Sequence, residues 1–267
     1  MNLPSILTNE VSLRMFIKLL NTNKGLPLRE WFKYARSICD GLPSEECLLT
    51  LIREKSTKDK GLVGKLIEYG FFGQKPNCNS APDIGVLNCD IKSCAFKTMK
   101  NGKNAKERQT ITNCGNTKNY DSFKHIVDNE KFESCPYYKK SKQFLLCIRN
   151  DDKKKMKTVE ELMNQPMTLI VFVNIEQLPL EMITMIQTDY TNIRQCVLDK
   201  KVSQKGQQYL HIHTHGAGHG SGNRAFGFTS KFITRVVALQ LAELHEKKIE
   251  DIVIESGKSI AIKNEYL

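Results

Sequence analysis

The chain has 267 residues, enough for one or two domains, and 40% of them are hydrophobic, which suffices to bury a core. Its 40 lysine and arginine residues exceed its 29 acidic residues, giving a formal net charge of +11. This excess favours a polyanionic partner, either nucleic acid or an anionic membrane surface, although a solvated lysine-rich surface explains it too. The longest apolar run, around 169–173, is far below the about 20 residues that span a bilayer, so we expect no membrane segment.

The N-terminus has no basic stretch followed by an apolar core, so we expect no signal peptide. Nine cysteines are spread from Cys39 to Cys196, and no pair has the CxxC spacing of a zinc site. Reduced thiols in a cytoplasmic compartment, or a nuclear one for a eukaryotic or viral protein, are the simplest interpretation, and secretion is not expected.

The N-terminal part of the chain reads as helical before its character changes. Apolar residues at helical spacing predict four helices, over 11–22, 27–39, about 44–53 and 61–70. A loop rich in Asn, Ser and Pro follows over 76–82, and 84–91 is expected to be a strand.

The remainder alternates between strands and helices. Thr158 and Glu161 have the spacing of a capping box, so a short helix is expected to start there. Strands are predicted over 144–149, 169–175, 208–214, 252–254 and 260–262, and a long helix from Thr229 or Ser230 to about 248. This mixture indicates an α/β fold.

Two aspartates and a lysine form the pattern that carries most chemistry. Pro82 precedes Asp83 at the start of the pattern. Asp90 and Lys92 lie two residues apart, so these two side chains project from the same face of a strand. Two carboxylates can hold Mg²⁺ with open positions for water and phosphate, and a nearby lysine can position or deprotonate the water. The pattern predicts phosphodiester hydrolysis, with Asp83 and Asp90 as metal ligands and Lys92 acting on the water.

A surface strand with solvated charges is the commoner explanation of so short a pattern when it is taken alone. The alternating strand around Asp90 and the polar loop before it favour the catalytic interpretation. Glu68, on the predicted helix just upstream, is a candidate third carboxylate, for which an exposed helical glutamate is the ordinary alternative.

Residues 60–68, KGLVGKLIE, resemble a helix of MutH, a DNA mismatch-repair nicking enzyme, and of its restriction-enzyme relatives that cut at GATC. Asp83, Asp90 and Lys92 then match the spacing of that family's PD-(D/E)xK motif, with Asp90 where MutH has Glu. Segments 107–112 (ERQTIT), 134–145 and 209–215 are similar to family segments in the same order. The resemblance covers about residues 60–240.

The resemblance implies a restriction-endonuclease-like fold, with a mixed central sheet flanked by helices and two lobes around a DNA cleft. It implies a single domain over 1–267, with the catalytic lobe at about 55–175 and the recognition region at about 195–248. Lys139 falls at a lysine that the family uses near the scissile phosphate, with Tyr138 in place of a histidine.

The segment YLHIHTH (209–215) resembles a YLQIRPK stretch in which arginine and lysine read bases, so the resemblance places base-reading side chains at His213 and His215. Arg224 follows at a distance, and Gly227 stands where the family carries an aromatic residue. These departures mean that the target need not be GATC.

His211, His213 and His215 alternate along the predicted strand and therefore share one face. We favour a DNA-facing strand, with the glycines of 216–223 allowing close backbone approach. A zinc site is an alternative, with His219 nearby, and a flexible exposed loop is another.

Lys97, Lys100 and Lys103 surround the Asn-Gly pair at 101–102, a strong hairpin signal. Lysines there would contact phosphates without reading sequence, although a solvated charged turn is also plausible.

Together these features predict a Mg²⁺-dependent, sequence-specific endonuclease acting on double-stranded DNA, with a type II restriction endonuclease as first choice. A MutH-like strand-nicking repair enzyme and a non-catalytic DNA-binding module of the same fold are the alternatives. Assembly of two chains on DNA is left open.

Overall fold

The computed structural model describes residues 8–55, 61–75, 82–150, 158–202, 205–216, 221–257 and 259–267. Most of the expected loop 76–82, and His219, lie outside these residues. The chain divides into two compact units, one made of Met1–Lys97 and Gln143–Val173, the other of Thr98–Lys142 and Asn174–Leu267.

The first unit is built on strands in the order β5-β4-β1, namely β5 (Met167–Asn174), β4 (Gln143–Asn150) and β1 (Cys89–Met99). β1 and β4 run parallel, with Asp90 opposite Phe144 and Lys92 opposite Leu146. Every residue of β5 is buried, as expected for a strand covered on both faces, and its near-continuous apolar sequence follows from that burial.

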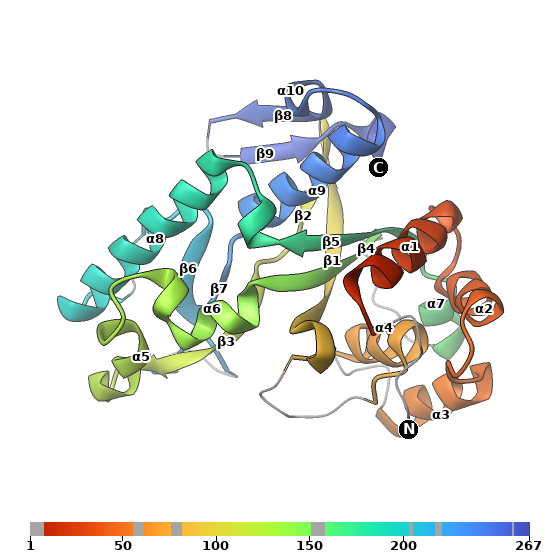
Figure 1. Ribbon diagram of the computed structural model, residues 1–267, viewed down its shortest axis with the longest axis horizontal. Coiled ribbons are helices and arrows are strands. Elements are labelled where there is room, and N and C mark those ends of the chain that lie inside the picture. The colour runs from red at the N-terminus through yellow and green to blue at the C-terminus, as the bar shows by residue number, and fades with distance from the viewer. Residues whose placement is uncertain are drawn as a thin grey trace. The chain divides into compact units, whose positions relative to one another are not determined.

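Helices α1 (Glu10–Leu20), α2 (Leu28–Ile38), α3 (Glu45–Lys55), α4 (Leu62–Phe72) and α7 (Val159–Met163) complete this unit (Figure 1). Their core is aromatic: the Phe71 ring centroid lies 4.7 Å from that of Phe32 and 6.1 Å from that of Trp31. A Cβ at Gly70 would overlap the Phe32 ring, so only glycine lets α4 approach α2 this closely.

The second unit contains two groups of antiparallel strands. β2 (Gly102–Ala105) pairs with β9 (Ser259–Ile262), which pairs with β8 (Val253–Ser256). A separate three-stranded sheet has the order β3-β7-β6, formed by β3 (Gln109–Asn116), β7 (Asn223–Phe228) and β6 (Leu210–Thr214). The central position of β7 brings β3 and β6, about a hundred residues apart in sequence, onto one surface.

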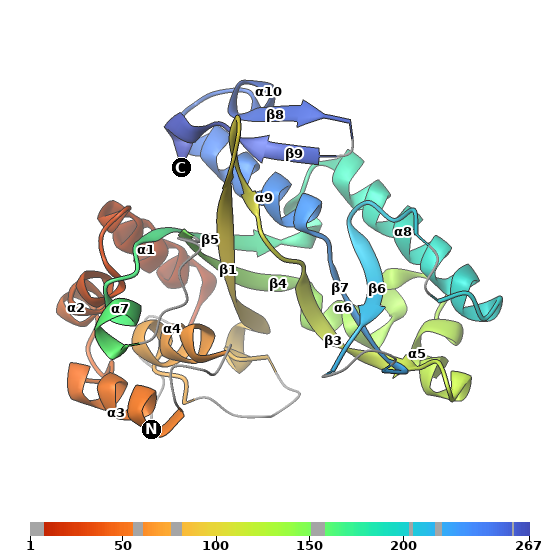
Figure 2. The ribbon, with the colours of Figure 1, turned by 180° about the vertical axis from the view of Figure 1, so that it is seen from behind.

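Helices of this unit are α5 (Lys124–Val127), α6 (Pro136–Ser141), α8 (Leu180–Leu198), α9 (Ser230–Leu244) and α10 (Ile249–Ile252), as Figure 2 shows from behind. Phe226 of β7 packs among Phe132, Tyr137 and Tyr190, with ring centroids 5.7 to 6.4 Å away. One face of the three-stranded sheet is thereby anchored to α6 and α8.

The α/β class, with parallel and antiparallel strands and flanking helices, is confirmed, as is the capping box at Thr158 and Glu161. The DNA cleft and the proposed lobe boundaries stay predictions. No helix among the described residues is long and apolar enough to cross a membrane. The cysteines that the structure describes are all free thiols.

The prediction of a strand over 84–91 is wrong for residues 84–88, whereas residues 89–91 do belong to a strand. A 3₁₀ turn occupies Gly85–Leu87, Asn88 takes a left-handed conformation with φ of 48°, and β1 begins only at Cys89. Val86 and Leu87 are apolar residues of that turn rather than strand positions. Helix α8 and strand β7 were not predicted from the sequence.

Gly70→Ala should destabilise the protein by about 1–3 kcal/mol, because the new methyl group overlaps the Phe32 ring in a packed core. Gly64→Ala in the same helix is the control, since its Cβ would meet its nearest neighbours at 3.9 Å, an ordinary contact. Urea unfolding of both variants measures the difference. Equal stability of the two would show that the α2–α4 contact is looser than described.

Candidate active site

The chain turns back on itself immediately before β1. Ile84 and Cys89 exchange backbone hydrogen bonds, with N···O distances of 2.9 and 3.2 Å. The left-handed Asn88 closes this turn. As a result the Asp83 carboxylate lies against β1, where its Oδ2 accepts a hydrogen bond from the Ile91 N–H at 2.7 Å.

Asp90 and Lys92 face the same side of β1, as the strand spacing predicts. Lys92 Nζ lies 2.7 Å from Asp90 Oδ2. The Asp90 side chain is only 2% exposed, and this oxygen receives no well-directed hydrogen bond, so the contact is an ion pair rather than a hydrogen bond. A buried carboxylate oxygen without a directed hydrogen bond is uncommon in folded proteins.

Glu68 of α4 belongs to the same cluster. Burial and the nearby Asp83 raise the pKa of Glu68 to about 7, an effect opposed by Lys92 and reinforced by Asp90. A Cβ at Gly64 would lie 3.9 Å from both Glu68 Oε1 and Ser93 Cβ, so this turn of α4 packs on β1. The structure therefore brings together Glu68, both aspartates and Lys92, all within the first unit.

The donor set of this cluster suits Mg²⁺, which prefers carboxylate oxygens and commonly binds through one or two of them, with water and phosphate completing its shell. Among the described residues, no three His, Cys, Asp or Glu side chains form a ready-made metal cage. Asp83 and Asp90 supply two carboxylates, the number through which Mg²⁺ commonly binds, and the Oδ2 of Asp90 is ion-paired only with Lys92 among the described residues.

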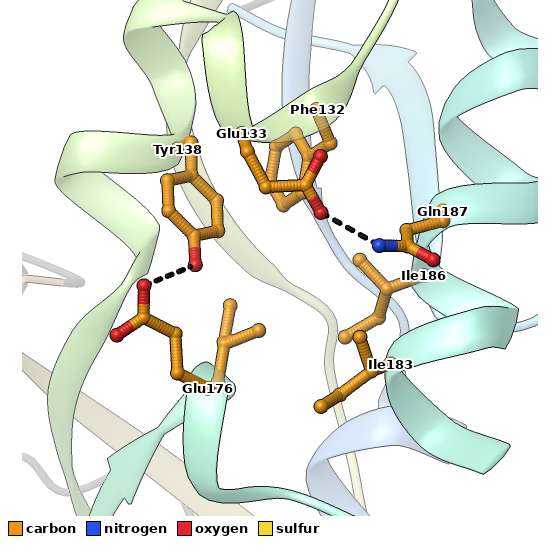
Figure 3. Close-up of a pocket in the computed structure, with 8 residues that line it drawn as sticks. Phe132, Glu133, Tyr138, Glu176, Ile183, Ile186 and Gln187 are labelled. Atoms are coloured by element: carbon orange, nitrogen blue, oxygen red, sulfur yellow. Dashed lines mark hydrogen bonds between the residues drawn. The ribbon is translucent and has the colours of Figure 1, made fainter. Parts of the chain in front are cut away.

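Lys139 lies on α6 in the second unit and is exposed, so its role at the scissile phosphate stays a prediction. Its neighbour Tyr138 lines a hollow of about 230 Å³ and donates a hydrogen bond to Glu176 at 3.0 Å (Figure 3). In the same hollow, Gln187 donates to Glu133 at 2.8 Å. Both carboxylates thus accept hydrogen bonds within the hollow, which Ile183 and Ile186 also line.

The three strand histidines of β6 and its end differ in exposure. His213 is 8% exposed, His211 is half-buried and His215 is exposed. His213 Nε2 lies 3.1 Å from Thr110 Oγ1, so its ring spans the central strand β7. It crosses at Gly227, where a Cβ would lie 3.2 Å from His213 Cε1 and collide with the Gln109 carbonyl. The absence of an aromatic side chain at Gly227 therefore makes room for this hydrogen bond.

Burial and the positive charge of Arg108 lower the pKa of His213 to about 3 and that of His211 to about 4. Both rings are consequently neutral at pH 7. His213 Nδ1 and His211 Nε2 are buried without a hydrogen-bond partner. A zinc site built from these histidines alone is not formed within the described part of the chain.

The remaining basic candidates occupy different settings. Lys97 lies at the end of the first unit, and Lys100 is exposed at the turn between β1 and β2. Lys103 Nζ lies 3.4 Å from the Leu267 carbonyl oxygen, and Arg224 Nη1 donates to the Ser221 carbonyl at 2.8 Å. Arg108, the last residue of the basic stretch 97–108, is exposed and acts electrostatically on the β6 histidines.

No protein-family model matches the chain. It is similar to the type II restriction enzyme Sau3AI of Staphylococcus aureus, with 26% identity over 230 residues, which is 76% of this chain. The match covers 44% of that relative, so the chain spans less than half of the length of the curated protein that it matches.

Acid should destabilise the protein through His211 and His213. Their pKa values lie below the ordinary 6.5 in the folded state, so the unfolded chain binds more protons between about 6.5 and 4. The free energy of unfolding should fall with decreasing pH there, by up to about 1.4 kcal/mol per pH unit for each histidine. His213→Gln, which keeps a donor for Thr110, should weaken this dependence, and the exposed His245→Gln should not. Urea unfolding at pH 7, 6 and 5 measures this pH dependence. The prediction is contradicted if the free energy of unfolding changes with pH to the same extent in both variants.

Proposed function

We propose that the chain is a Mg²⁺-dependent endonuclease of the PD-(D/E)xK type that cuts DNA at a short specific sequence. The observation that carries the proposal is the cluster on β1. Asp90 is buried there with an ion pair to Lys92 at 2.7 Å, and Asp83 is folded back onto Ile91. Burying carboxylates close together is unfavourable for stability, and such clusters are found most often at functional sites.

Asp83 and Asp90 would hold Mg²⁺ at this position. The cation, when bound, neutralises charge on the phosphoryl oxygens and lowers the pKa of the attacking water. Lys92, drawn to Asp90 in the free protein, is placed to orient that water and to stabilise negative charge in the transition state. Glu68, with a pKa of about 7, can exchange a proton near neutral pH.

The net charge of +11 supports DNA binding, because it attracts the phosphate backbone irrespective of sequence. Lys97, Lys100 and Lys103 are the proposed phosphate contacts. His215, exposed at the end of β6, and Arg224 on the neighbouring strand are the proposed base-reading side chains. Since His213 is buried, His211 is half-buried and both rings are neutral, we assign them a role in stabilising this strand rather than in neutralising phosphate charge.

Similarity to a type II restriction enzyme favours double-strand cleavage as part of restriction over the MutH-like nicking reaction. The chain matches less than half of that relative, so nothing about the assembly of this chain is taken from it. We propose that two chains assemble on DNA. A DNA-binding module without activity is the competing outcome. Plasmid DNA incubated with the protein and Mg²⁺ separates the three, giving linear DNA, nicked circles or no cleavage.

Asp83→Asn and Asp90→Asn should each reduce Mg²⁺-dependent cleavage by at least about 100-fold while DNA affinity stays within about threefold, because each removes a metal ligand rather than a DNA contact. Asp40→Asn, which changes an exposed carboxylate of the same unit, is the matched control. Cleavage is measured on a mapped plasmid and affinity in Ca²⁺ without turnover. Near-normal cleavage by either variant would remove the catalytic assignment.

Lys92→Met should lower the cleavage rate at saturating Mg²⁺ by about 100-fold or more, with a small change in the Mg²⁺ concentration needed for half-maximal rate. In the proposed mechanism the Lys92 ammonium contacts the water and the phosphate and does not help to bind the metal ion. Lys33→Met is the control, since that lysine is exposed on α2. A large shift in the Mg²⁺ titration with the saturated rate preserved would reassign Lys92 to the metal site.

A further inference from the structure

A buried carboxylate of α8 binds the backbone at the start of β6. Asp189 is 2% exposed and accepts hydrogen bonds from three consecutive backbone N–H groups, those of Gln208, Tyr209 and Leu210. The Gln208 N–H lies 2.9 and 3.0 Å from the two carboxylate oxygens, and the Leu210 N–H lies 3.0 Å from one of them. A buried aspartate with this many directed donors is a specific anchor, because charged hydrogen bonds are stronger than neutral ones.

The same segment is held from its carbonyl side by the start of α9. Thr229 donates from its hydroxyl to the Gln208 carbonyl at 2.6 Å and from its backbone N–H to the Tyr209 carbonyl at 2.8 Å. Lys231 Nζ reaches Gln208 Oε1 at 2.9 Å. Residues 208–210 are thus fixed between α8 and α9 before the chain enters β6, and Figures 1 and 2 both show α8 beside that strand.

This anchor matters because β6 is a five-residue strand at the edge of its sheet. Its register places Leu210 opposite Phe228 and Thr214 opposite Arg224. A slip of one residue would move every side chain of the strand to the other face. The His213 ring would then leave Thr110, and His215 would be displaced relative to Arg224.

We infer that Asp189 is a positioning residue for DNA selectivity, which fixes the register of β6 and so the place of His215. The inference rests on the proposed function, in which the end of β6 reads bases. Asp189 lies outside the β1 cluster, belongs to the second unit and needs no contact with DNA. Burial raises the pKa of Asp189, whereas the three backbone donors lower it, so the anchor is strongest with the carboxylate charged.

Asp189→Asn tests this, because the side chain keeps its size but turns one acceptor into a donor that faces the Gln208 N–H. The ratio of cleavage at the preferred site to cleavage at sites with one base pair changed should fall by at least about tenfold, the scale of a base contact. Hydrogen exchange at Gln208, Tyr209 and Leu210 should accelerate. Asp199→Asn, an exposed acid just beyond α8, should change neither.

A double-mutant cycle with His215→Ala separates positioning from general stability. If Asp189 acts through the end of β6, Asp189→Asn should alter the selectivity ratio less than twofold in a chain that already lacks His215. Equal loss of cleavage on all sequences, in proportion to the lost folded fraction, would overturn the inference. Asp189→Glu, which keeps the charge and shifts the acceptors, serves if the Asn variant does not fold.

The two proposals fail in distinguishable ways. A wild-type protein that neither cuts nor selects DNA overturns the proposed function and this inference with it. A wild-type protein that selects DNA, with Asp189→Asn selecting equally well, overturns the inference alone.

Discussion

The hydrogen bond from the Ile91 N–H to Asp83 is the contact on which the candidate site depends. Asp83 precedes β1 and would point away from Asp90 if the chain entered the strand directly. The reversal through the left-handed Asn88 and the Ile84–Cys89 bridge returns it to the strand. Parallel pairing of β1 with β4 then buries Asp90, so backbone geometry rather than side-chain attraction gathers the negative charges.

Such a gathering works against stability in the free protein. Asp90 keeps a buried oxygen without a directed hydrogen bond, and Glu68 holds its proton up to a pKa of about 7 because of burial and the aspartates. Lys92 relieves part of this repulsion but is one charge among three acids. A divalent cation would relieve the rest, which is the physical argument for the proposed metal site.

Local patterns in the sequence predicted much of this. Helical periodicity found α1, α2, α3 and α4, capping residues located α7 and α9, and the spacing of Asp90 and Lys92 predicted their shared face. The chain reversal after Asp83 was not predicted, because the apolar residues Val86 and Leu87 are typical of a strand although they belong to a 3₁₀ turn. The Thr110–His213 and Asp189–Tyr209 contacts join segments distant in sequence, so no local pattern contains them.

Buried polar groups at the three-stranded sheet are stabilised differently from those of the β1 cluster. Its buried polar groups are neutral imidazoles or a carboxylate surrounded by backbone donors, so desolvation is met by hydrogen bonds or by loss of charge. Gly227 permits the His213 ring to cross β7, and Asp189 sets where β6 begins. Gly227 and Asp189 both act on β6, the strand that His215 follows. Under the proposed function, a substitution at either position would alter DNA sequence recognition while leaving Asp83, Asp90 and Lys92 unchanged. Under the proposed function, cleavage and selectivity would then be separable by mutation, since the β1 cluster and His215 belong to different compact units.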